Sequence, residues 1–305
     1  MKAGTAGLGF VGALIVSGCS GHDPSAATAS SDFSLRFDLS KPVNQTYEIH
    51  REWKAMPKNT GSGNQVHDIT VRVQGAGLKA GAASDAHLPI TLKVAHFSGK
   101  DLDGGETNHL RKIASEIETQ TLHRPFTSLG PTGDWESGGS NNAGWAGMMA
   151  DKAMGSYEIG FMDVSYPSEP VHVGSKWTKE IPFGDEVLYR GDRVADEIHD
   201  LKGNQVHCTF ELRKLDPIKR TATIAYSGST KITFSYQASY PQADGSLPKA
   251  NPDLFIDERQ EGEWDVNLDT GLPIRFTAKR TTKENFGSAA KESTESTVTA
   301  ATLKA

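Results

Sequence analysis

The sequence contains little cysteine: Cys19 and Cys208 are the only two among 305 residues. Two cysteines exclude a disulfide-stapled scaffold. The chain also lacks a basic excess, because 32 Lys and Arg stand against 38 Asp and Glu, which gives a net charge of −6. An acidic chain without a basic block argues against nucleic acid as the main partner. No apolar run approaches the roughly 20 residues that a membrane-spanning helix needs, so a polytopic membrane protein is excluded.

The N-terminus carries a short apolar run, residues 8–16 (LGFVGALIV), after the positive charge of Lys2. A run of this length after a positive start is typical of a secretory signal. The segment that ends it, Val16-Ser17-Gly18-Cys19, resembles the bacterial lipobox. The resemblance implies cleavage before Cys19 and lipidation of that residue, and the alternative is an ordinary signal peptide with a chance cysteine. We expect a signal peptide at 1–18, a lipidated flexible tether at 19–32 and a β-rich domain at 33–305.

Lipidation at Cys19 would anchor the protein to a membrane, because each buried CH₂ of an acyl chain contributes about 0.8 kcal/mol. Removal of residues 1–18 would leave 31 basic and 38 acidic side chains, a net charge of −7. Ser20 follows the cysteine. By analogy with enterobacterial sorting, this residue implies the bacterial outer membrane, with the periplasmic or surface side left open.

The body of the chain alternates apolar and polar residues with period two, which is the signal of half-buried strands. One example is Tyr47, Ile49, Arg51 and Trp53, and Val206-His-Cys-Thr-Phe-Glu-Leu212 is another. We therefore predict a mainly β fold: a curved or barrel-like antiparallel sheet. Two short helices are predicted at 108–120 and 142–157 from apolar residues at helical spacing. A division into two halves, 33–135 and 165–305, joined by a helical and Gly-rich segment at 136–164, also fits the pattern.

Two segments of the second half resemble a known group of proteins. They are Pro167-Ser-Glu-Pro-Val-His-Val-Gly-Ser-Lys-Trp177 and Asp269-Thr-Gly-Leu-Pro273 with the residues before it. The pair is similar to segments of uncharacterised, secreted or lipid-anchored bacterial β-proteins, in which a Pro-x-x-Pro-Val-x-Val-Gly-x-x-Trp stretch precedes an Asp-x-x-Thr-Gly-Leu-Pro-like hairpin. The resemblance covers about 130 residues and implies architecture; the group has no assigned chemistry to transfer.

Catalytic and metal motifs are few. Asp269-Thr-Gly271 matches the aspartic-protease signature, but those enzymes need two such carboxylates and the chain has one copy. A tight hairpin turn is the favoured interpretation. The acidic segment 101–106 lacks the glycine and glutamate spacing of a calcium loop. We expect no catalytic residue, metal or cofactor, and we expect Cys208 to be a buried apolar thiol.

The inner face of a curved sheet remains as the candidate site. Candidate ligand-lining residues are large and apolar: Trp53, Trp135, Trp145, Met148 and Met149. The first hypothesis is a lipid-anchored envelope protein that binds an apolar or amphipathic ligand there. The alternative is a solid core, with the outside or the Gly-rich loop docking on another envelope protein. A third hypothesis is a hydrolase with a site assembled across strands.

Overall fold

The computed structural model describes residues 32–56, 64–79, 86–101, 114, 117–118, 121–133, 135–137, 160–182, 198–203, 205–236, 246, 251–285 and 293–304. Asp32–Ala305 form one compact unit. In the described part every element is a strand. The helix expected at 142–157 lies outside the described residues. Of 108–120 only Ala114, Ile117 and Glu118 are described, and there the Glu118 N–H donates to the Ala114 carbonyl at 2.9 Å, as in a helical turn.

The elements are thirteen strands. In chain order they are β1 (Val43–Met56), β2 (Gln65–Gly75), β3 (Leu88–Asp101), β4 (Thr121–Thr127), β5 (Gly130–Pro131), β6 (Glu136–Ser137), β7 (Lys176–Pro182), β8 (Ile198–Lys202), β9 (Gln205–Asp216), β10 (Thr221–Tyr236), β11 (Asn251–Asn267), β12 (Pro273–Asn285) and β13 (Ser293–Leu303).

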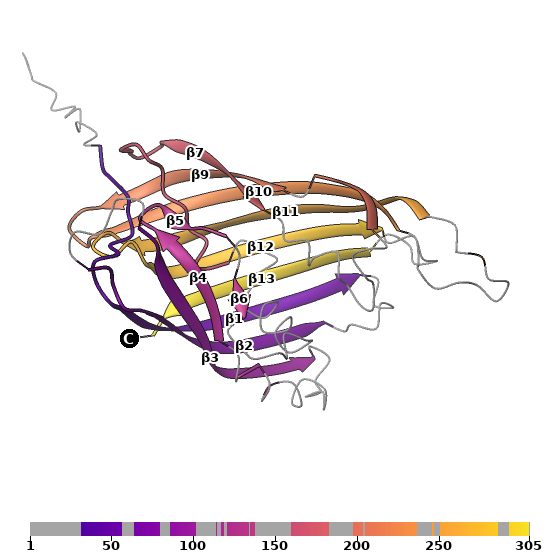
Figure 1. The fold of residues 1–305 in the computed structure, drawn as a ribbon, viewed down its shortest axis with the longest axis horizontal. Helices are drawn as coiled ribbons and strands as arrows, with labels where there is room; N and C mark the ends of the chain where they lie inside the picture. Colours follow the sequence, from indigo (N-terminus) through magenta and orange to yellow (C-terminus); the bar gives the residue numbers. More distant parts are fainter. Residues whose placement is uncertain are drawn as a thin grey trace, which may run out of the picture. The chain divides into compact units, whose positions relative to one another are not determined.

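All thirteen strands belong to one antiparallel sheet, in the order β5-β4-β3-β2-β1-β13-β12-β11-β10-β9-β7, with β6 beside β4 and β8 beside β10. The first and last long strands are neighbours, so β1 and β13 lie side by side in Figure 1. Among the described strands β5 and β7 form the two edges, and the sheet is open rather than closed. The mainly β, antiparallel prediction is confirmed.

Burial follows the alternation of the sequence. In β9 the inward side chains Val206, Cys208, Phe210 and Leu212 are buried, as predicted for one face of that strand. In β3 the alternation changes parity, because a register shift opposite Thr70 and Val71 inserts a β-bulge. The bulge exposes His96 and buries Phe97.

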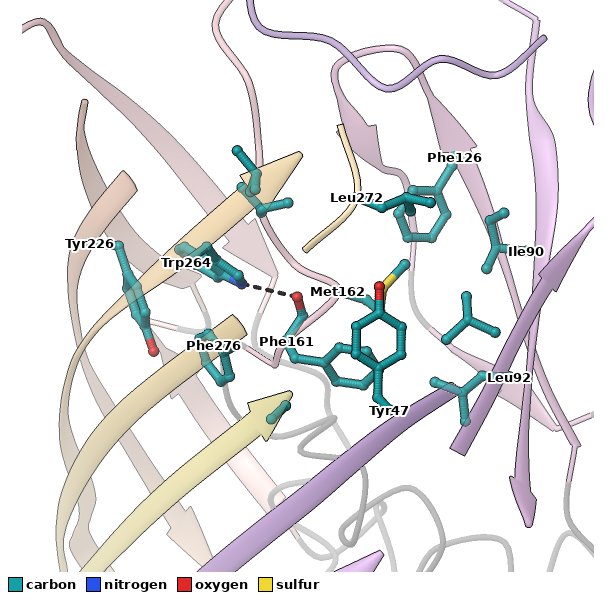
Figure 2. Close-up of a cluster of buried hydrophobic side chains, with 14 of the residues drawn as sticks. Tyr47, Ile90, Leu92, Phe126, Phe161, Met162, Tyr226, Trp264, Leu272 and Phe276 are labelled. Atoms are coloured by element: carbon teal, nitrogen blue, oxygen red, sulfur yellow. Dashed lines mark hydrogen bonds between the residues drawn. The ribbon is translucent and has the colours of Figure 1, made fainter. Parts of the chain in front are cut away.

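The segment 160–166 shows why the sheet curves. The Phe161 ring packs against the Tyr47 ring of β1, with the ring centroids 4.8 Å apart. The Phe161 carbonyl accepts a 2.9 Å hydrogen bond from the Trp264 indole of β11 (Figure 2). The next residue but one, Asp163, pairs with Arg124 of β4. Strands from both halves of the sheet order therefore meet on one segment, so the sheet bends around it. Phe161–Tyr166 are all buried and form part of the core.

Candidate functional site

The apolar part of the inner face is filled by the chain itself. Trp264 is fully buried against Tyr226 and Phe276, with ring centroids 4.6 and 5.1 Å apart. On the opposite side lie Ile90 and Leu92 of β3 and Phe126 of β4 (Figure 2). The segment 160–166 lies between these groups and is fixed by hydrogen bonds from Trp177 to the Ser165 carbonyl and from Tyr166 to the Gly271 carbonyl. The described side chains of this part pack together as a hydrophobic core.

A second part of the inner face is polar. At the same level of five neighbouring strands, inward positions carry polar side chains or tryptophan. We call these residues the polar row: Glu258 and Gln260 of β11, Arg280 and Thr282 of β12, Thr297 and Thr299 of β13, Arg51 and Trp53 of β1, and Gln65 and His67 of β2. Apolar side chains flank the row, with Ile49 and Phe276 on one side and Leu254 and Ile256 on the other.

A buried ion pair forms one end of the polar row. Glu258 has no exposed surface, and Arg280 donates to its Oε2 from Nε at 2.7 Å and from Nη2 at 2.5 Å. Gln260 donates to the other carboxylate oxygen, and the Thr282 hydroxyl lies 3.4 Å from Oε2. Such a network is stable when every charge is paired, because the partner compensates for the hydration that each buried ion has lost.

The other end of the row is less completely paired. His67 is 9% exposed, and its Nε2 lies 3.2 Å from Gln65 Oε1. Its Nδ1 is buried and has no hydrogen-bond partner among the described residues, and the same holds for the hydroxyl of Thr299. In the strand register Arg51 pairs with Thr299 on one side and with His67 on the other. Burial, aided by the Arg51 charge, lowers the pKa of His67 to about 4, so the imidazole is neutral at pH 7.

Buried polar atoms without partners are uncommon in folded proteins, and an ordered water or ion is one explanation of such an atom. A neutral imidazole and a threonine hydroxyl can both donate and accept hydrogen bonds. This end of the row can therefore hold a polar group that enters the sheet.

The outer face carries a hollow of about 800 Å³ over β9–β12. Its floor consists of small residues of β10, Ser227, Gly228 and Ser229. His207 and charged side chains of the neighbouring strands stand around it: Asp257, Arg259, Glu261, Lys279 and Lys283. The strand register places Ser229 between His207 and Arg259. Short side chains on β10 thus lie between longer side chains on the neighbouring strands, and together they form a polar trough.

The candidate lining residues lie in different surroundings. Trp53 is half-buried within the polar row, paired in register with Thr297 and Gln65. Trp135 is half-buried against the core, 6.5 Å from Phe126, with the Arg124 guanidinium 5.6 Å from its ring. The remaining candidates, Trp145, Met148 and Met149, lie outside the described residues, as does Cys19.

The Asp269-Thr-Gly271 segment is a hairpin turn between β11 and β12, as favoured from the sequence. Asn267 Oδ1 accepts hydrogen bonds from the N–H groups of Asp269 and Thr270, and Gly271 takes a positive φ of 71°. The Asp269 carboxylate is half-exposed and binds Arg220 at 2.7 Å. Within the described residues no cluster of three His, Cys, Asp or Glu side chains is placed to hold a metal ion. Burial raises the pKa of the Cys208 thiol to about 12, which fits an apolar role.

The polar row was missed from the sequence, although its signal is present. Arg51 occupies an inward position of its strand, in line with Tyr47 and Ile49. Glu258 and Arg280 likewise occupy inward positions of their own strands. A charged residue among inward positions marks a buried polar group. Only the strand register, however, shows that these positions share one level.

The described part of the chain holds no helix that is both long and apolar enough to cross a membrane. No family model matches the chain, and no curated protein matches it. Among solved structures the chain is similar to one described as "lipid-protein interactions in lipovitellin", with a TM-score of 0.44 and 8% identity. The match covers 88% of this chain and 25% of that chain, so this chain spans about a quarter of its length.

Proposed function

We propose that the protein is a bacterial envelope lipoprotein, anchored to the outer membrane through lipidated Cys19, whose sheet binds an amphipathic ligand. The observation that carries the binding proposal is a pair of buried polar atoms, His67 Nδ1 and Thr299 Oγ1, for which the described part of the chain supplies no hydrogen-bond partner. The anchor is supported by the lipobox-like segment that ends at Cys19. The role is non-catalytic, and no nucleic acid or cofactor is part of it.

The ligand lies on the inner face with its polar group at the polar row. The apolar side chains that flank the row are buried in the core, so we place the ligand contact at the half-buried side chains of the row, Trp53 and Thr299. The half-buried Trp53 provides a large apolar ring beside the polar groups, and such rings suit the boundary between a head group and its chains.

The test is the amount of lipid that copurifies without a covalent bond. The full-length protein is purified from its membrane, extracted with organic solvent, and the extract is quantified by mass spectrometry; the covalent anchor stays on the protein. We expect a defined lipid class near one molecule per protein. The double variant His67→Leu, Thr299→Val should lose most of it, whereas Thr302→Val, on the exposed face of the same strand, should keep it. Equal retention by both variants contradicts the proposal.

A second candidate function rests on the outer hollow. The solid core around Phe161 and the trough over Ser227 and Ser229 favour docking of another envelope protein on the outside of the sheet. A photoreactive phenylalanine derivative in place of Ser229 should then give a protein–protein crosslink in intact cells. The same residue in place of Thr302 should give none.

A further inference from the structure

The hairpin between β9 and β10 presents an apolar side chain to solvent. Ile218 is 93% exposed at the tip of this turn. The turn is well defined, because the Lys219 N–H donates to Asp216 Oδ1 at 2.9 Å and the Arg220 carbonyl accepts from the Leu268 N–H at 2.8 Å. A fixed turn that holds a large aliphatic side chain in water forgoes the burial that would stabilise it.

A second exposed apolar side chain lies at the same end of β9. Val173 is 52% exposed, and the adjacent Gly174 N–H donates to the Leu212 carbonyl of β9 at 2.7 Å. Of the three large apolar side chains that are exposed in the described part, only Val298 lies elsewhere, on the outer face of β13. Exposed apolar residues are thus concentrated at one end of the sheet.

The described N-terminus lies at this same end. Phe33 forms an isolated bridge with Val171, with hydrogen bonds of 2.7 and 2.9 Å. Figure 1 shows the first described residues, which begin at Asp32, and the β9–β10 hairpin at one end of the strands. Residues 20–31 separate Cys19 from Asp32 in the sequence, so a lipid on Cys19 would be attached to the chain twelve residues before this end.

The charges around the tip complete the pattern. Residues 213–220 (RKLDPIKR) contain four cations and one carboxylate. Arg220 is paired with Asp269, whereas the exposed Lys214 and Lys219 form no side-chain ion pair within the described residues. An exposed aliphatic residue flanked by free cations suits an interface with anionic lipid, where the apolar group enters the head-group layer and the cations face phosphates.

We propose that this end of the domain docks on an anionic lipid surface, with Ile218 entering the head-group region, with Val173 at the same end of β9, and with Lys214 and Lys219 facing lipid phosphates. This docking surface is separate from the ligand site of the polar row. The anchor at Cys19 raises the local concentration of the tip at the membrane and supplies no contact of its own.

The test places an environment-sensitive NBD dye on the full-length protein at Ile218→Cys, in a Cys208→Ala background. The protein is incorporated into vesicles of phosphatidylglycerol and phosphatidylcholine. We expect NBD emission to rise at least twofold, and nitroxide-labelled lipid to quench it. The matched control, Val298→Cys, should show neither effect. Equal behaviour of the two labels overturns the proposal.

Charge-reversal variants test the role of the two lysines. Lys214→Glu with Lys219→Glu should remove at least half of the Ile218 response on anionic vesicles, whereas Lys279→Glu with Lys283→Glu, on the outer face, should leave it unchanged. An unaltered response in the first variant overturns the lipid-phosphate contact. Flotation of the protein with the vesicles reports the anchor separately. If the protein does not float, the anchor proposal fails, and the same labels in a Cys19→Ala, Cys208→Ala background, titrated with added vesicles, still decide the docking proposal.

Discussion

Arg280 of β12 donates two hydrogen bonds to one carboxylate oxygen of Glu258 on β11, and both side chains are buried on the inner face of the sheet. The pair lies one strand away from Thr297 and two strands away from Arg51. A core that contains such a pair is not a plain apolar interior. Its polar groups are arranged in a row, and the account of ligand binding depends on that row.

The ion pair predicts an unequal effect of two arginine substitutions. Arg280→Met leaves Glu258 buried without its cation, and we expect the free energy of unfolding to fall by about 3–5 kcal/mol. Arg275→Met removes an arginine of the exposed face, which binds Glu263 and Asp265 at 2.9 Å, and should cost at most about 1 kcal/mol. Urea denaturation measures both. Equal costs would show that the buried pair does not have the described surroundings.

The hairpin glycine Gly271 predicts a second unequal pair. A Cβ at this position would lie 2.2 Å from the Arg36 carbonyl oxygen, and the residue has a positive φ. Gly133 also has a positive φ, but a Cβ there would meet no atom within 4 Å. We expect Gly133→Ala to cost about 1 kcal/mol and Gly271→Ala about 3 kcal/mol or more, measured by urea denaturation. A similar cost for both variants would contradict the close approach at Arg36.

The buried histidine predicts a loss of stability in acid. The pKa of His67 is lowered to about 4 by burial and then by Arg51, with Asp68 acting in the opposite direction. An unfolded chain has a histidine pKa near 6.5, so it binds the proton first as the pH falls. His67 should therefore destabilise the fold by about 3 kcal/mol between pH 7 and pH 4.

The variant His67→Leu should remove that part of the pH dependence in a denaturation series, whereas Gln65→Leu, which keeps the buried imidazole, should retain it. Parallel profiles for wild type and His67→Leu would place His67 in water rather than in the core.

The anchor predicts a difference between the two cysteines. Cys19→Ala should abolish incorporation of an alkyne-labelled fatty acid in growing cells, because it removes the acceptor thiol. Cys208→Ala should keep the label, because Cys208 is buried in β9. In-gel fluorescence after coupling of a dye to the alkyne measures both. Labelling of the Cys19→Ala protein would remove the basis for anchorage.

Local alternation was sufficient to predict most of the long strands and their antiparallel sheet, but not β4 or the polar β13. Val206, Cys208, Phe210 and Leu212 show why, because every second residue of β9 meets the core. The bulge near His96 was not predicted, since one inserted residue leaves no mark in an alternating pattern. The segment 160–166 was also missed: it is buried through contacts with Tyr47, Arg124 and Trp264, which are distant in sequence. The polar row likewise depends on the register of five strands, which sequence alone does not provide.

The most direct test of ligand binding uses a photoreactive phenylalanine derivative at two adjacent positions of β1. Trp53 faces the polar row, whereas Lys54 is exposed on the other face of the same strand. After irradiation of intact cells, the account predicts a crosslinked adduct of lipid mass at position 53 and none at position 54, detected by mass spectrometry of the purified protein. Absence of a lipid adduct at position 53, or equal adducts at both positions, would contradict binding on the inner face.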